Sequence, residues 1–200
     1  MSWLQLDLLR DQYRDLSIDM TPGKCKDATF IVTGANIGLG LETSRHLVRL
    51  GSKKVILAVR NIKAGEEGLR DIEASTNRKG VAEVWHLDLG DYDSVKTFAK
   101  RANESLDRLD GLIENASIAL DKWSLAGEHE TTIAVNVYGT FLLAVLLLPK
   151  LKETGRKFNM SPHLVVVASS FAFEFEGEVN GLQKGGLDSL DSATSKMAAR

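Results

Sequence analysis

The sequence predicts a doubly wound α/β fold, in which helices cover both faces of a parallel sheet. Two observations support this prediction. Short runs that are apolar on both faces alternate along the chain with segments of helical periodicity, and strands buried on both faces are typical of parallel sheets. The chain also has 200 residues, 44% of them hydrophobic, which is enough to bury the core of one domain.

Each element of this fold has its own signal. Aliphatic and β-branched residues fill five expected strands, at 29–32, 54–59, 82–87, 111–114 and 163–168. Helical patterns lie between them, at about 38–50, 63–76, 91–107 and 126–152. Ligands in doubly wound folds bind beyond the carboxyl ends of the strands. The residues that end each strand are therefore the candidates for a site.

Residues 1–26 are expected to form a helical extension ahead of a domain at 27–200. Apolar residues recur there at helical spacing: Trp3, Leu6, Leu9, Tyr13 and Leu16. Charged residues interrupt the segment, so it lacks the unbroken apolar core of a secretory leader. Its polar face has mixed charge, which favours docking on the domain or on a partner over attachment to a membrane.

Composition excludes several classes of partner. The formal net charge is -2 and the basic residues are scattered, so we expect no nucleic-acid partner. Cys25 is the only cysteine and the four histidines are far apart, which predicts no disulfide, no metal site and a reducing, cytoplasmic setting. Residues 131–148 lack charge, but polar residues fill the first half and Pro149 follows. We therefore expect a buried or interface helix and no membrane span.

The stretch "TGANIGLG" lies where the first strand is expected to lead into a helix. Its glycines, Gly34, Gly38 and Gly40, would allow a tight bend and a close approach of a ligand to the backbone. The free N–H groups of the following helix favour a pyrophosphate. The spacing differs from G-x-G-x-x-G, and a loop with three glycines can also be an ordinary turn.

In this setting the pattern T-G-x-x-x-G-x-G resembles the nucleotide-binding signature of the short-chain dehydrogenase/reductase family, whose fold is of the Rossmann type. The resemblance implies a nicotinamide dinucleotide as cofactor and an oxidoreductase activity on a small carbonyl or alcohol. It assigns cofactor-binding roles in this loop to Gly34, Asn36, Ile37, Gly38, Leu39 and Gly40.

The end of the second strand indicates which cofactor is preferred. Dinucleotide folds that prefer NAD usually place an acid there to bind the ribose 2′-hydroxyl. This chain has Arg60 instead, with Lys63 close behind. A guanidinium can pair with a 2′-phosphate in a bidentate fashion. The sequence therefore favours NADP over NAD, although an exposed loop arginine is the ordinary alternative.

Later strand ends carry further family signatures. Asp88 and Leu89 resemble the pair that sets the adenine ring. Asn115 and Ala116 match the middle of the family's N-N-A-G. Two departures flank them, because Glu114 replaces the first asparagine and Ser117 replaces the glycine.

Two more residues match catalytic positions of the family. Asn136 matches the asparagine of N-x-x-G, which holds a water in the proton relay. A buried asparagine can also simply bond to the backbone. The fifth strand ends with Ser169 and Ser170, and Ser170 resembles the catalytic serine, whose hydroxyl can bond a substrate carbonyl oxygen as charge develops on it.

The family's Tyr-x-x-x-Lys motif is missing. All three tyrosines, Tyr13, Tyr92 and Tyr138, precede Ser170. In the family this tyrosine acts as acid or base on the carbinol and the lysine lowers its pKa. The similar spacing in "SATSK" has a serine at that position, and we interpret it as coincidence. We expect a truncated chain that is inactive alone, from a subgroup like the retinol dehydrogenases, the WW-domain oxidoreductases and fungal reductases of secondary metabolism.

Two functional hypotheses follow. The first is an NADP-dependent oxidoreductase, of which this chain is the cofactor half. The second is a dinucleotide-binding pseudoenzyme or interaction module. A methyltransferase would need an acid where Arg60 stands. Family members associate through the long helix, so a homo-oligomer, dimer or tetramer, is expected, with an apolar surface formed by Phe141, Leu142, Val145, Leu146 and Leu148.

Overall fold

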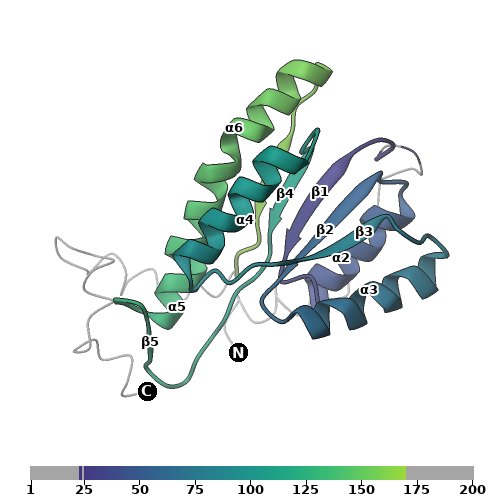
Figure 1. Ribbon diagram of the computed structural model, residues 1–200. Coiled ribbons are helices and arrows are strands. Elements are labelled where there is room, and N and C mark those ends of the chain that lie inside the picture. The colour runs from purple at the N-terminus through teal and green to yellow at the C-terminus, as the bar shows by residue number, and fades with distance from the viewer. Residues whose placement is uncertain (1–22, 24, 170–200) are drawn as a thin grey trace, which may run out of the picture.

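Five parallel strands form the central sheet, in the order β3-β2-β1-β4-β7 (Figure 1). The computed structural model describes residue 23 and residues 25–169, so the expected N-terminal helix lies outside the described residues. The strands are β1 (Thr29–Thr33), β2 (Lys54–Val59), β3 (Ala82–His86), β4 (Gly111–Glu114) and β7 (His163–Val166). The predicted parallel sheet is confirmed, and its last strand ends two residues earlier than expected.

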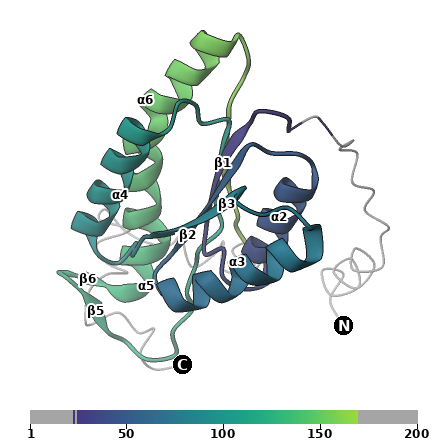
Figure 2. The same ribbon diagram turned by 45° about the vertical axis from the view of Figure 1, so that its right-hand side comes forward.

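Helices cover both faces of this sheet. One pair lies on one face and the other pair on the opposite face, as Figures 1 and 2 show from two directions. The first pair is α2 (Gly38–Arg49) and α3 (Ile62–Thr76), and the second is α4 (Tyr92–Ser105) and α6 (Thr140–Phe158). The helix expected at 91–107 is α4, and it has an acidic N-cap, because the Asp91 side chain accepts hydrogen bonds from the N–H groups of Asp93 and Ser94.

Two apolar cores lie on the two sides of the sheet. Successive strand residues point to opposite faces, so Ile31 of β1 joins the core under α4 and α6 while Val32 joins the core under α2 and α3. Cys25 is buried in the second core. The alternation anchors β1 from both sides, which fixes the position of the loop that follows it.

The predicted bounds of the long helix, 126–152, are wrong at both ends. A two-stranded hairpin, β5 (Leu125–Ala126) and β6 (His129–Glu130), occupies its start. Gly127 has a φ of +63° in the two-residue turn, a conformation that suits the turn of a hairpin and not a helix. The helical segment begins only after this hairpin, as α5 (Thr131–Ile133) followed by the π-helical η1 (Ala134–Gly139), and α6 then continues to Phe158.

Pro149 lies inside α6 and does not end it. Proline lacks the N–H that would bond to the carbonyl of Val145. Both residues are exposed, so water can satisfy the free carbonyl and the helix continues. Pro149 therefore marks a solvent-facing position of α6 and not its boundary.

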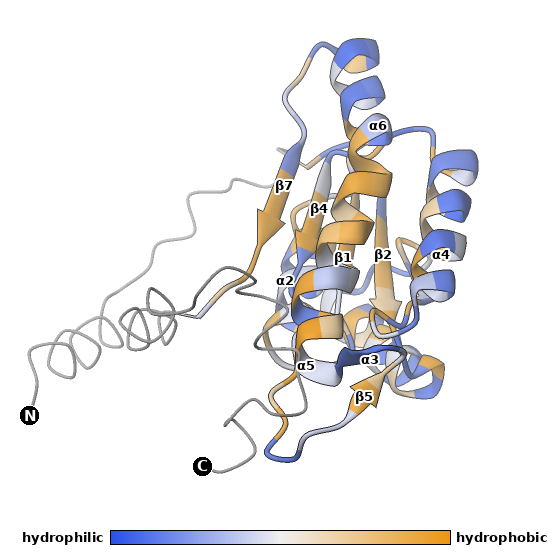
Figure 3. Ribbon diagram, turned by 90° about the vertical axis from the view of Figure 1, so that its left-hand side faces the viewer, coloured by the Kyte–Doolittle hydropathy of each residue, from blue (hydrophilic) through white to orange (hydrophobic). Residues whose placement is uncertain are grey.

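One helical segment among the described residues, Thr131–Phe158, is long and apolar enough to cross a membrane by length and composition. Figure 3 shows its apolar residues concentrated in the middle of α6. Leu143, Leu147 and Leu151 on this helix belong to the core that lies under α4 and α6. This arrangement is that of a core helix with one exposed side.

Candidate functional site

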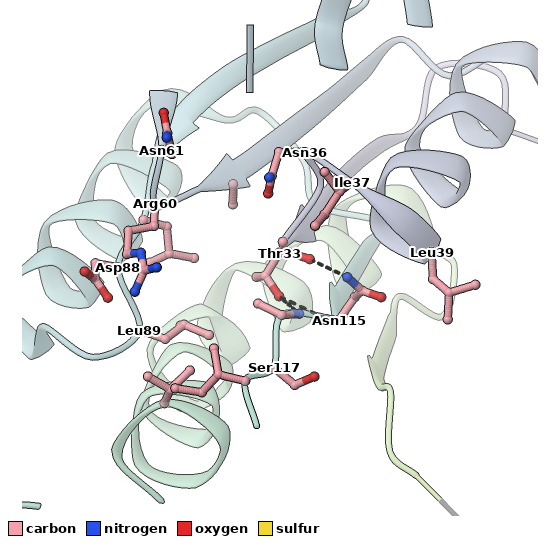
Figure 4. A pocket seen from close by; sticks show the side chains of 16 residues that line it. Thr33, Asn36, Ile37, Leu39, Arg60, Asn61, Asp88, Leu89, Asn115 and Ser117 are labelled. Atoms are coloured by element: carbon pink, nitrogen blue, oxygen red, sulfur yellow. Dashed lines mark hydrogen bonds between the residues drawn. The ribbon is translucent and has the colours of Figure 1, made fainter. Parts of the chain in front are cut away.

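A pocket of about 450 Å³ lies at the carboxyl ends of the strands, where the order of the sheet reverses between β1 and β4 (Figure 4). Doubly wound folds bind ligands at this reversal point. The structure brings most of the predicted site together here, since the pocket lining includes Gly34, Asn36, Ile37, Leu39, Arg60, Asp88, Leu89, Asn115 and Ala116.

The glycine loop is shaped for close contact. Gly34 has a φ of +66°, and a Cβ added there would lie 2.9 Å from the Cα of Ala116. A Cβ on Gly40 would lie 2.4 Å from the carbonyl oxygen of Gly34. These two positions therefore have no room for a side chain. Gly38 has open space around it but a φ of +56°, so its role is conformational.

Helix α2 begins at this loop without a side-chain cap. Its N-cap residue, Ile37, has extended backbone, and its side chain provides no hydrogen bond to the first turn. The first N–H groups of the helix are thus available to a ligand, and the positive end of the helix dipole favours an anion. The loop and the helix together form a cradle for a phosphate-bearing group.

Thr33 and Asn115 join the glycine loop to the end of β4. The hydroxyl oxygen of Thr33 accepts hydrogen bonds from the backbone N–H groups of Asn115, at 3.0 Å, and of Ala116, at 2.9 Å. The side-chain amide of Asn115 donates to the Thr33 carbonyl at 3.0 Å. Asn115 thus braces the floor of the pocket, and its amide nitrogen is the atom that a Cβ on Gly40 would meet at 2.6 Å.

Arg60 follows β2 directly and is exposed at one end of the pocket. Figure 4 shows it close to Asp88, with Leu89 next to them. Lys63, predicted as a second cation, lies in the first turn of α3 and does not line the pocket. Asn61 does line it, and its side chain also caps α3 by accepting from the N–H of Ala64 at 3.1 Å. We missed Asn61, although an asparagine just before a helical pattern is an N-cap signal.

Asp88 is held in place by its neighbours. Its carboxylate accepts a hydrogen bond from the N–H of Gly90 at 2.9 Å, and its own N–H donates to the hydroxyl oxygen of Ser94 at 3.0 Å. Leu89 is buried, and its carbonyl oxygen lies where a Cβ on Gly139 would come within 2.0 Å. The third strand end is therefore packed directly on η1.

The sequence model of one protein family, the short chain dehydrogenases, matches residues 28–175 of this chain. This chain belongs to the short chain dehydrogenase family. It is 51% identical to the short chain dehydrogenase atnD of Emericella nidulans over 146 residues, which are 72% of this chain and 46% of that protein. It is 44% identical to the short chain dehydrogenase/reductase dmxR8 of a Cryptosporiopsis species over 154 residues, 76% of this chain and 48% of that protein.

Solved structures of short chain dehydrogenases have the same fold. One from Escherichia coli CFT073, complexed with NADPH, superposes with a TM-score of 0.63 at 26% identity, covering 92% of this chain and 70% of that one. One from Shigella flexneri, complexed with NADP, gives 0.62 at 26% identity, covering 79% and 64%. The chain spans about half the length of the curated relatives it matches.

Glu114 departs from the family pattern and lies in an unusual setting for a carboxyl group. Its side chain is 2% exposed at the end of β4. Strand alternation places it on the same face as Leu112, which belongs to the core under α4 and α6. Neither carboxylate oxygen has a hydrogen-bond partner among the described residues. Burial raises the pKa of Glu114 to about 8, because the charged form loses its hydration.

Asn136 lies in η1 and faces the segment after β4. Its amide oxygen accepts from the N–H of Ile118 at 2.9 Å, and its amide nitrogen donates to the Ile118 carbonyl at 2.8 Å. The backbone-bonding alternative thus describes its side chain, which fixes Ile118 beside the pocket. Its part in a proton relay stays a prediction. Ser169 follows β7, while Ser170, the predicted catalytic serine, lies outside the described residues.

Proposed function

We propose that the protein containing this chain is an NADP-dependent oxidoreductase that interconverts a small carbonyl compound and an alcohol. The observation that carries this proposal is the pocket at the sheet reversal. This pocket has two features of a site for NADP. Its glycine loop is so tight that one added Cβ would fill it, and the residue after β2 is an arginine and not an acid. Solved relatives with the same fold were crystallised with NADP or NADPH.

Each end of the pocket has a proposed role. The N-terminus of α2, with the loop from Gly34 to Gly40, holds the pyrophosphate. Arg60 pairs with the 2′-phosphate, with Lys63 as a more distant cation. Asp88 and Leu89 hold the adenine ring, and Asn115 and Ala116 form the floor beneath the rest of the cofactor. The bound nicotinamide supplies hydride chemistry at the carbonyl carbon.

The catalytic groups on this chain are proposed to act on the substrate oxygen. Ser170, after β7, hydrogen-bonds the carbonyl oxygen and stabilises the charge that develops on it. Asn136 holds the adjacent backbone and contributes to the proton path. Because the chain spans about half of its relatives' length, we assign the acid that protonates the oxygen to the remaining half.

We further propose that the intact protein is a homo-oligomer in the cytoplasm. Three residues of the predicted association surface, Phe141, Val145 and Leu148, are exposed on one side of α6. The other two, Leu142 and Leu146, pack partly against the core instead. The exposed side is the surface proposed for contact with a second copy.

Arg60→Ala tests the choice of cofactor. In the intact protein we expect it to weaken NADPH binding by about 1.5–3 kcal/mol, the typical loss of a charged hydrogen bond, and to leave NADH binding nearly unchanged. Fluorescence titration with both cofactors measures this. Arg70→Ala, at an exposed position on α3 away from the pocket, is the control. Equal losses for NADPH and NADH would show that Arg60 does not bind the 2′-phosphate.

A further inference from the structure

Ser117 is the second departure from the family's N-N-A-G pattern. It places a hydroxyl where that pattern has no side chain. The backbone accepts this change without strain, because Ser117 is not among the residues with positive φ. Its side chain lines the cofactor pocket and is exposed. Within residues 25–169, no hydrogen bond occupies its hydroxyl.

Both neighbours of Ser117 are fixed. On one side, the N–H of Ala116 donates to the Thr33 hydroxyl at 2.9 Å. On the other side, the Ile118 N–H donates to the Asn136 side chain at 2.9 Å, and the Ile118 carbonyl accepts from it at 2.8 Å. The backbone that carries the Ser117 side chain is thus held between a clamp to β1 and a clamp to η1. A ligand that bonds to this side chain therefore does not have to order the backbone beneath it.

The position of Ser117 selects one part of a dinucleotide. Arg60 and Asp88 lie together at the β2–β3 side of the pocket, and Figure 4 shows Ser117 away from them, below Asn115. A dinucleotide lies across the point where the strand order reverses, with one half on each side. Since the adenosine half is placed at Arg60 and Asp88, the nicotinamide half extends toward the segment after β4, where Ser117 stands.

We propose that the Ser117 hydroxyl hydrogen-bonds an oxygen of the nicotinamide half of the bound cofactor. The oxygen belongs either to the ribose or to the phosphate that carries it. A serine hydroxyl can donate to a phosphate and can both donate to and accept from a ribose hydroxyl. This inference rests on the proposed NADP-binding function and adds a specific contact to it.

The test measures binding of cofactor fragments by calorimetry, in the intact protein and in its Ser117→Ala and Ser117→Gly variants. Both variants are expected to bind NADP about 3- to 10-fold more weakly, the usual effect of one lost hydrogen bond. Adenosine 2′,5′-bisphosphate, which lacks the nicotinamide half, should bind equally well to all three proteins. Adenosine 2′-phosphate 5′-diphosphate keeps the second phosphate without its ribose, so an equal loss for this ligand assigns the contact to the phosphate, and no loss assigns it to the ribose.

Two controls separate this inference from the proposed function. Ser105→Ala removes an exposed hydroxyl on α4 that donates a hydrogen bond to the Arg101 carbonyl, and it should not change NADP binding. Arg60→Ala should weaken NADP and adenosine 2′,5′-bisphosphate alike. If wild-type protein binds NADP but the Ser117 variants bind it equally well, or lose the bisphosphate too, the Ser117 contact is wrong. If wild-type protein binds no NADP, the proposed function itself fails.

Discussion

Glu114→Gln is expected to remove a large pH dependence from the stability of the protein. Wild-type protein should lose about 1.4 kcal/mol of unfolding free energy per pH unit from this one group, and the glutamine variant should not. The difference in unfolding free energy between the two proteins should therefore change by about 4 kcal/mol between about pH 5 and pH 8.

The sign follows from the direction of the pKa shift. Burial raises the folded pKa of Glu114 from its ordinary value of 4.5 to about 8, so the folded state keeps a proton that the unfolded chain has released. The contribution is fully present below pH 4.5 and is lost as the pH rises to about 8, above which it levels off. Glutamine is similar in shape to the protonated acid but does not titrate.

Urea unfolding of the intact protein at several pH values measures this effect. Other titrating groups are shared by both proteins and cancel in the difference. Glu104→Gln is the matched control, because Glu104 is an exposed residue of α4 whose one ion pair among residues 25–169 is a 4.0 Å contact with Lys100. Parallel pH profiles for wild-type protein and Glu114→Gln would show that Glu114 is ionised in the folded state.

Gly40→Ala is expected to damage both the fold and the cofactor site. The added Cβ would lie 2.4 Å from the Gly34 carbonyl oxygen and 2.6 Å from the Asn115 amide nitrogen. Because both atoms belong to the braced floor of the pocket, the first turn of α2 must move away from it. We expect about 2–4 kcal/mol of lost stability and at least a 100-fold loss, or about 2.7 kcal/mol, in NADP binding.

Two other glycines show whether the damage is steric. Gly38→Ala meets no atom within 4 Å but must adopt a φ of +56°, so it should lose about 1–2 kcal/mol of stability from backbone strain. Gly80→Ala has a similar φ of +71° and open space far from the site, and it should leave NADP binding intact. Denaturation and calorimetry on all three variants give the comparison. A Gly40→Ala protein no worse than Gly80→Ala would mean that the loop is loosely packed.

Much of the fold could be predicted from the sequence because its signals are local. The strands are short aliphatic runs buried on both faces, such as 54–59, and helix α4 begins at an acidic cap, Asp91. The residues that follow these strands then predicted most of the pocket lining, since parallel strands bring their carboxyl ends to one edge of the sheet. Arg60 and Asp88 are separated by 28 positions in the sequence, and both line this pocket.

What could not be predicted depends on contacts between distant segments. The hairpin at 125–130 and the π-helical turn at 134–139 interrupt a run that looks helical, because Gly127 turns the chain and Gly139 must pass the Leu89 carbonyl. The burial of Glu114 depends on which face of β4 meets α6, and local sequence does not specify this. Asn136 likewise looks like a polar residue in an apolar helix until Ile118 is placed beside it.

The central claim is that the pocket between β1 and β4 binds NADP in preference to NAD. Calorimetric titration of the intact protein with NADPH and with NADH tests it most directly. The account predicts one site per chain and an NADPH affinity at least about 10-fold higher, equivalent to about 1.4 kcal/mol, supplied by the 2′-phosphate at Arg60. Binding of neither cofactor, or tighter binding of NADH than of NADPH, would contradict it.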